Sequence, residues 1–343
     1  MACSLYKKIL ELKQSIAQLT SNETLDAFDL EFCKLIDSGS IDDKFIESRF
    51  KKTLRELNLT GGVDYNEHYR SAYESYNEAV TYIALRDKGI TIKGIPECKT
   101  STPDFEISVN CSYCGDEPDL KTIYLEVKTL GFAMGNLIYK QSQSDSLDCQ
   151  IRIEEQHRKG KRMCMAERSV APLGYVGFVK EVECIIQKID QNLKSDQFSF
   201  GDGKSTLLFV DLNQLCYSRQ MEDCLPVYPD LAHNCCASGK LWLIAFSNIG
   251  ERVYLKPEFE GKGCFGDELQ QQGILNQHTY VKGIIFGLGK TPDEKTFYGF
   301  YRSEQEDDPT TVALQKICDF SNDEQNSNGW RYFEDYKKDI GIE

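Results

Sequence analysis

The sequence predicts an α/β protein built on a mixed sheet that is flanked by helices. A helical pattern over residues 68–88 precedes three short runs rich in β-branched and aromatic residues. An amphipathic helical pattern over 174–194 then precedes a further run of the same kind at 205–212. Helix, three strands, helix and strand in this order are typical of a mixed α/β sheet. The hydrophobic content of 41% is sufficient to fill a core.

The N-terminal residues 1–62 are expected to form a helical segment ahead of this sheet. Apolar residues recur there at three- and four-residue steps, which is the period of one helical face. They do so in three stretches, 5–19, 22–39 and 41–57. No residue in this segment suggests chemistry, so we expect it to serve packing or dimerisation.

The region 63–250 is expected to hold the core, and 251–343 to be a β-rich C-terminal extension of it or a small accessory domain. At about 150 residues per domain, a chain of 343 residues allows two domains or one large domain with additions. The helix over 68–88 ends at Gly89. The predicted strands lie at 90–95, 104–109, 123–129, 205–212, 240–247, 280–287 and 296–301.

Charge and composition exclude several classes of protein. With 40 basic and 54 acidic residues the net charge is −14, so a polyanionic partner must be held by a local basic patch or through metal ions at a carboxylate cluster. Fourteen cysteines are too few for a disulfide-stapled secreted scaffold. The N-terminus becomes charged too early for a signal peptide, and no apolar stretch approaches the ~18 residues of a membrane span. We therefore expect a cytoplasmic protein with no membrane partner.

Two of the predicted strands place charged residues on one face. In 104–109 apolar residues alternate with Asp104 and other polar residues, and in 123–129 they alternate with Glu126 and Lys128. Successive side chains of a strand point to opposite faces. The connecting residues 110–122 are rich in Gly, Asp, Pro and Cys, which suits an antiparallel hairpin. Pairing across this hairpin can bring Asp104 beside Glu126 and Lys128.

Two carboxylates and an ammonium group on one strand face suit phosphodiester hydrolysis. The carboxylates of Asp104 and Glu126 are hard oxygen ligands for Mg²⁺, which completes its shell with waters and substrate phosphate oxygens. The metal lowers the pKa of a bound water and neutralises charge that builds on the phosphate. Lys128 can orient that water or stabilise the developing negative charge.

This pattern resembles the PD-(D/E)XK nuclease superfamily, whose members share a restriction-endonuclease-like fold. Pro103-Asp104 matches the first half of the motif and Glu126-Val127-Lys128 the second, and the resemblance covers about residues 70–250. It implies a nuclease dependent on Mg²⁺ or Mn²⁺. Asp104, Glu126 and the backbone carbonyl of Val127 would bind the metal, and Lys128 would position water or steady the transition state.

The resemblance also implies a further acidic residue on the helix before the sheet. Glu78 is the natural match, and Glu74, one turn earlier on the same stripe, is the alternative. By analogy with the superfamily, DNA is favoured over RNA as the substrate, and a DNA endonuclease of the restriction or defence kind is expected. A homodimer would allow such a core to cut both strands.

The letters of the motif are not specific by themselves, and two other interpretations stay open. Pro-Asp occurs four times and acid-x-Lys at several further places, but only positions 104, 126 and 128 lie on alternating strands at hairpin spacing after an amphipathic helix. One alternative is a catalytically weak module that binds nucleic acid or an effector on the same fold. The other is an α/β interaction protein in which Asp104 and Glu126 lie far apart or on opposite faces.

Basic residues cluster after the third strand, within a helical pattern at 149–165. We interpret them as candidates for gripping nucleic-acid phosphates, which would supply the salt-dependent part of the affinity. The candidates are Arg152, Arg158, Lys159, Lys161 and Arg162. His157 and Arg168 belong to the same cluster. The other interpretation is a solvated helix face whose charges are balanced by neighbouring glutamates.

Cys111 and Cys114 have the spacing of a zinc knuckle. Cys98 can serve as a third ligand, but no second Cys-x-x-Cys or His pair completes a tetrahedral site. Two thiols in a hairpin loop are therefore the simpler interpretation of this pair.

Overall fold

The computed structural model divides the chain into two compact units. The first comprises residues 1–79 and 131–176, and the second comprises 80–130 and 177–343. The residues that the structure describes are 4–17, 23–59, 65–96, 101–110, 120–131, 148–165, 178–198, 205–214, 227–230, 235–255, 264–302, 304, 308–324 and 331–332.

The first unit is helical in its described segments. Its elements are α1 (Leu5–Ala17), α2 (Glu23–Asp26), α3 (Leu30–Gly39), α4 (Lys44–Asn58), the N-terminal part of α5 (Tyr65–Asp87) and a helix over 148–158. Helices α1, α3 and α4 contact one another around a buried core that includes Leu5, Ile9, Phe32, Ile36 and Ile46. The helical character predicted for the N-terminal segment is confirmed.

Aspartate side chains fix where these helices begin. Asp29 accepts hydrogen bonds from the Glu31 and Phe32 amides at the start of α3, and Asp43 caps α4 in the same way. The Asp37 carboxylate accepts from the first amides of α1. The prediction of one helix over 22–39 is wrong, because the Asp29 cap starts a new helix and separates α2 from α3.

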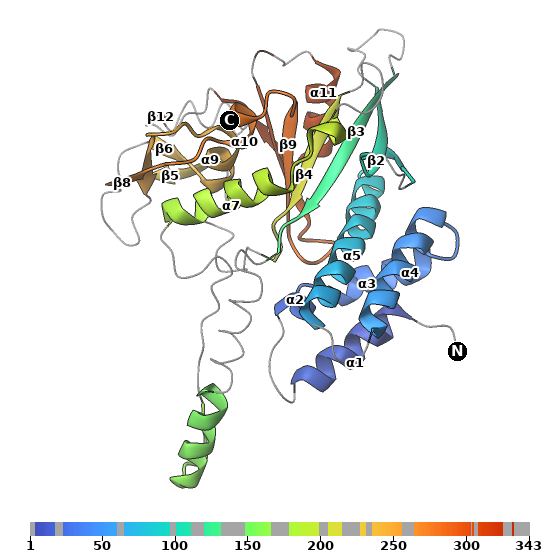
Figure 1. Ribbon diagram of the computed structural model, residues 1–343, viewed down its shortest axis with the longest axis vertical. Coiled ribbons are helices and arrows are strands. Elements are labelled where there is room, and N and C mark those ends of the chain that lie inside the picture. The colour runs from blue at the N-terminus through green and yellow to red at the C-terminus, as the bar shows by residue number, and fades with distance from the viewer. Residues whose placement is uncertain are drawn as a thin grey trace. The chain divides into compact units, whose positions relative to one another are not determined.

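The second unit is built on a mixed sheet (Figure 1). In the described part of the chain this sheet has seven strands in the order β1-β2-β3-β4-β9-β10-β11. They are β1 (Thr91–Gly94), β2 (Phe105–Asn110), β3 (Leu120–Thr129), β4 (Thr206–Asp211), β9 (Gly283–Leu288), β10 (Thr296–Tyr301) and β11 (Phe320–Asn322). Strand β4 lies between β3 and β9 and is parallel to both, whereas β1, β2 and β3 pair antiparallel. The predicted mixed α/β class is confirmed.

Helices cover both faces of this sheet. On one face, α11 (Pro309–Ile317) contacts β2, β3, β4 and β9, and its Leu314 lies against Gly283 and Gly299. On the other face, the ring of Phe300 contacts Phe246 of α9 (Lys240–Phe246), and α9 packs with α7 (Phe178–Asn192). Gly299 and Phe300 are successive residues of β10, so their side chains point to opposite faces.

Smaller elements complete the described part of the second unit. They are the short helices α8 (Ser195–Phe198) and α10 (Ile274–Gln277), a hairpin of β7 (Arg252–Leu255) and β8 (Cys264–Glu268), and a sheet of β5 (Val227–Asp230), β6 (Cys235–Ser238) and β12 (Arg331–Tyr332). Within the segments that the structure describes, no helix combines the length and the apolar composition needed to cross a membrane.

The predicted strand at 240–247 is wrong, whereas the other six predicted strands are confirmed. Residues Lys240–Phe246 form α9, and all seven are buried. A helix buried on every side is apolar all round and has no 3.6-residue periodicity, so its sequence cannot be distinguished from that of a buried strand. Lys240 is buried as well, and its ammonium group is paired with the Glu181 carboxylate of α7 at 2.5 Å.

Candidate functional site

The β2–β3 hairpin brings the two predicted carboxylates together. Its register pairs Phe105 with Leu125, so that Asp104 and Glu126 lie opposite each other one residue further along the ladder. The Asp104 amide donates to the Leu125 carbonyl at 3.1 Å, and Asp104 Oδ2 accepts from the Val127 amide at 2.8 Å. These bonds hold the Asp104 carboxylate against β3. They contradict the alternative in which the two carboxylates lie far apart or on opposite faces.

Glu126 and Lys128 lie on the face of the sheet that α9 covers. Glu126 is opposite Leu208 of β4, which is opposite Ile284 of β9, which in turn is opposite Phe300 of β10. Residues that are directly opposite across a sheet share a face, and Phe300 contacts α9. The carboxylate of Glu126 therefore points into the protein, and the residue is only 2% exposed.

Lys128 and Gln197 hold one oxygen of the Glu126 carboxylate. Lys128 Nζ is 2.6 Å from Glu126 Oε1, and Gln197 Nε2 donates to the same oxygen at 2.5 Å. Lys128 Nζ also donates to Gln197 Oε1 at 3.1 Å. The three side chains thus close a ring of hydrogen bonds around one carboxylate oxygen.

Burial dominates the electrostatics of Glu126. Removal from water, followed by the nearby negative charge of Asp104, raises the pKa of the Glu126 carboxyl to about 7. Lys128 and Gln197 act in the opposite direction, because they favour the ionised form. The site therefore holds a carboxyl group that changes its charge near neutral pH, which is typical of functional sites.

The second oxygen, Glu126 Oε2, is buried and receives no hydrogen bond from any residue that the structure describes. A buried charged oxygen without a donor is destabilising, and a cation beside it would remove that penalty. The half-buried Asp104 carboxylate is its neighbour. Two such oxygens fit Mg²⁺ or Mn²⁺, since Mg²⁺ binds through one or two carboxylates and completes its shell with waters and phosphate oxygens.

Further protein ligands from other side chains are not evident. The described segments contain no group of three or more His, Cys, Asp or Glu side chains arranged to hold a metal ion. The remaining ligands at Asp104 and Glu126 would be waters, substrate oxygens and the expected carbonyl of Val127. Cys98, Cys111 and Cys114 lie outside the described residues.

Glu78 lies in the part of α5 that belongs to the first unit, where it pairs with Arg49 of α4. Glu78 Oε2 and Arg49 Nε are 2.6 Å apart, and their side chains are 16% and 6% exposed. The alternative residue, Glu74, is more exposed and has Arg70 Nε at 3.8 Å from its carboxylate. Both glutamates therefore have a cationic partner on the helices of the first unit, which the sequence pattern did not indicate.

The predicted basic residues lie in an exposed segment of the first unit. Residues 148–158 are helical, and the turn that follows folds back because the Gln156 side chain exchanges two hydrogen bonds with the main chain of Met165, at 2.9 and 3.2 Å. The guanidinium group of Arg158 forms an ion pair with the Glu154 carboxylate, with Nη2 and Oε2 3.5 Å apart. All five candidates are exposed, namely Arg152, Arg158, Lys159, Lys161 and Arg162. Arg168 lies outside the described residues.

Gln197 is the site residue that sequence reasoning missed. It belongs to the four-residue helix α8, between α7 and β4. A short polar helix carries no periodicity, and Gln has no preferred place in a metal-site motif. The one available signal was position, because α8 comes directly before the strand that pairs in parallel with the site strand β3.

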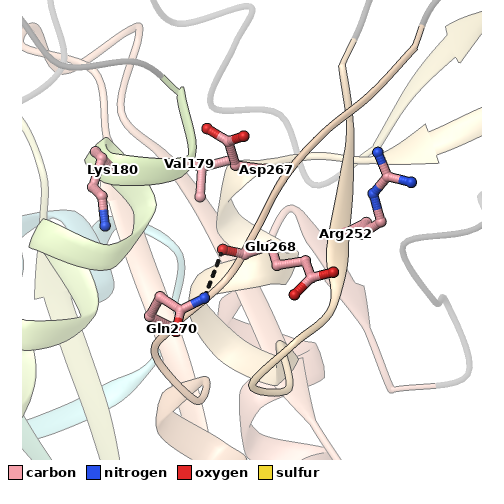
Figure 2. A pocket seen from close by; sticks show the side chains of 6 residues that line it. All are labelled: Val179, Lys180, Arg252, Asp267, Glu268 and Gln270. Carbon is pink, nitrogen blue, oxygen red and sulfur yellow. Dashed lines mark hydrogen bonds between the residues drawn. The ribbon is translucent and has the colours of Figure 1, made fainter.

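A separate pocket of about 480 Å³ lies between α7 and the β7–β8 hairpin (Figure 2). Its lining carries two cations and two carboxylates, and the lining residues are Val179, Lys180, Arg252, Asp267, Glu268 and Gln270. Lys180 pairs with Glu183 at 2.5 Å, and Arg252 is the register partner of Glu268 in the β7–β8 hairpin. The lining includes none of the predicted site residues, and its balanced charge selects no ligand class.

Comparison with known protein families, with curated proteins and with solved structures gave no significant match to this chain.

Proposed function

We propose that this protein is a metal-dependent nuclease of the PD-(D/E)XK type, which hydrolyses phosphodiester bonds at Asp104, Glu126 and Lys128. One observation carries the proposal: two carboxylates meet across the β2–β3 hairpin beside a lysine, and one buried oxygen, Glu126 Oε2, has no hydrogen-bond donor in the described part of the chain. Most buried polar side-chain atoms have a hydrogen-bond partner within the protein or in ordered water. A carboxylate left with an open oxygen suits a cation.

The order of elements supports the restriction-endonuclease-like core that this proposal requires. The end of α5, strands β1, β2 and β3, helix α7 and strand β4 come in this order along the second unit, with the short helix α8 between α7 and β4. The candidate residues lie on β3 and directly before β2, and β4 adds to β3 in parallel. A sheet of this kind positions both carboxylates through backbone pairing rather than through flexible loops, which favours a fixed metal site.

Each residue has a defined part in the proposed mechanism. Asp104 and Glu126 would hold the divalent cation, with the Val127 carbonyl as the expected third protein ligand. When bound, such a cation lowers the pKa of a bound water and neutralises charge on the phosphate. Lys128, which lies beside Glu126 Oε1, donates to a phosphate oxygen or to the attacking water as negative charge develops. The Val127 amide keeps the Asp104 carboxylate in place.

We further propose DNA as the substrate, cut by an endonuclease of the restriction or defence kind that acts as a homodimer. The chain as a whole has a net charge of −14, so a phosphate backbone has to be held by a local basic surface. The exposed basic residues of 152–162 provide that surface, and none of them is buried in a core. The choice of DNA and of a homodimer rests on analogy with nucleases of this fold.

The test is a cleavage assay with supercoiled plasmid, single-stranded DNA and RNA, each with Mg²⁺, Mn²⁺ or EDTA. We expect metal-dependent cutting by the wild type and no cutting by Asp104→Asn. Glu106→Gln is the matched control, because Glu106 belongs to the same strand face two residues further along, and this variant should keep its activity.

Two results would contradict the proposal. Cutting that persists in Asp104→Asn, or that is unchanged by EDTA, would show that the chemistry lies elsewhere. Binding of DNA without cutting under any metal condition would instead favour the catalytically weak module that binds nucleic acid or an effector.

A further inference from the structure

We infer that Gln197 is a positioning residue of this site, which engages Glu126 Oε1 and thereby leaves Oε2 as the carboxylate oxygen that meets a divalent cation. The inference rests on the proposed function. It concerns a residue that belongs to no motif and that acts through Glu126 and Lys128 rather than on the substrate.

The side-chain amide of Gln197 forms hydrogen bonds to two of the predicted catalytic residues. Its Nε2 donates to Glu126 Oε1 at 2.5 Å, and its Oε1 accepts from Lys128 Nζ at 3.1 Å. A side-chain amide carries a donor nitrogen and an acceptor oxygen on the same carbon atom, whereas an ionised carboxylate only accepts and a thioether is at most a weak acceptor. An amide is therefore the group that can bridge a carboxylate and an ammonium group at this place.

The short helix that carries Gln197 is itself anchored over the site strand. The next residue, Phe198, is 7% exposed, and the centroid of its ring is 5.4 Å from that of the Tyr280 ring. Thr206, the first residue of β4, donates its hydroxyl to the Gln197 carbonyl at 3.4 Å. Thr206 is opposite Tyr124, which lies two residues before Glu126 on the same face of β3. The fold thus holds the Gln197 amide at a fixed place beside Glu126.

The consequence concerns the two oxygens of one carboxylate. With Gln197 and Lys128 both bonded to Oε1, the plane of the Glu126 carboxylate is fixed, and Oε2 is the oxygen left without a donor in the described segments. Without the amide the carboxylate can rotate about its terminal bond, and Lys128 can follow either oxygen. Loss of such a supporting hydrogen bond reduces metal affinity by about tenfold to a hundredfold.

The test measures Mn²⁺ binding to the full-length, metal-free protein by isothermal titration calorimetry. Gln197→Met removes both hydrogen bonds and keeps a side chain of similar length. Gln187→Met is the matched control, because it makes the same change at an exposed position of α7. Asp104→Asn identifies the site, since it should abolish binding. Thermal unfolding of each metal-free variant, followed by circular dichroism, separates positioning from stability.

We expect Gln197→Met to weaken Mn²⁺ binding by about tenfold or more while Gln187→Met binds as the wild type does. If Gln197→Met fails to fold, Gln197→Asn replaces it, because the shorter amide cannot span Glu126 and Lys128 together and should weaken binding in the same direction. Wild-type affinity in a folded Gln197 variant would overturn the inference and leave the proposed function intact. Absence of Mn²⁺ binding by the wild type would overturn the proposed function as well.

Discussion

Replacing Glu126 by Gln tests the electrostatics of the site without any reference to a substrate. In the metal-free protein, burial and then the charge of Asp104 raise the pKa of this carboxyl from 4.5 to about 7. The folded state therefore binds the proton more tightly than the unfolded chain does. The wild type carries no penalty below the unfolded pKa, and it loses stability as the pH rises through the folded pKa, because a buried carboxylate becomes charged. Gln has the same shape and does not titrate.

The size of the effect follows from the shift. One pKa unit corresponds to about 1.4 kcal/mol, so a change from 4.5 to about 7 corresponds to about 3 kcal/mol of folding free energy. Most of this develops between about pH 5 and about pH 8. Over that interval we expect the stability of the wild type to fall by about 2–3 kcal/mol relative to Glu126→Gln.

The assay is urea unfolding in the presence of EDTA at both pH values, followed by circular dichroism. The quantity that matters is the difference between wild type and variant at each pH, since titrating groups that do not interact with Glu126 contribute equally to both proteins. Glu106→Gln is the control, because Glu106 of β2 lies on the same face of the sheet as Glu126. Its stability should change with pH as that of the wild type does. If Glu126→Gln also runs parallel to the wild type, the buried carboxyl does not hold its proton and the reasoning is refuted.

Addition of Mn²⁺ extends the same measurement. A cation at Oε2 favours the ionised form of Glu126, so it should restore the stability that the wild type loses at about pH 8. At a free concentration of about one hundred times the dissociation constant, the gain is about 2.7 kcal/mol. The Glu126→Gln variant should gain much less, because it has lost a charged ligand of the proposed site.

Three further predictions concern other parts of the chain. Lys295→Met removes the cation that lies 3.0 Å from the fully buried Asp211, and should lower the free energy of unfolding by about 3–5 kcal/mol in urea. Gly299→Ala should lower the free energy of unfolding by about 1–3 kcal/mol in the same assay, because its new Cβ would lie 2.3 Å from Leu314 Cδ2. Replacing Leu314 by Ala as well should recover part of that loss. Replacing the three basic residues at 159, 161 and 162 by Gln should weaken DNA binding and reduce the slope of log affinity against log salt by about 2–3, and an unchanged slope would show that this segment holds no phosphates.

The hairpin was predictable because its physical determinants are local. Alternation in 104–109 and around Glu126 and Lys128 in 123–129 indicates which side chains share a face, and burial of the apolar set of β2 fixes the register. The structure has Phe105 opposite Leu125, which follows from burying the apolar set of both strands together. Asp104 and Glu126 then meet as a consequence of that register.

Other parts of the site depend on packing that no local pattern encodes. Gln197 was missed because its role arises from β3 and β4 pairing in parallel, which places α8 beside Glu126. The partner of Glu78 was missed because Arg49 comes from another helix. The sequence predicts a strand at 240–247 because burial on all sides removes the periodicity that would indicate a helix.

The charge balance of the site argues against a purely structural role. Asp104, Glu126 and Lys128 sum to −1 when all are ionised, and the neutral Gln197 does not change this. Glu126 Oε2 is buried without a donor in the described segments, and a buried charge in that state is destabilising unless a cation accompanies it. A divalent cation held by Asp104 and Glu126 would change the sum to +1, would reduce the repulsion between the two carboxylates and would supply the open Oε2 with a partner.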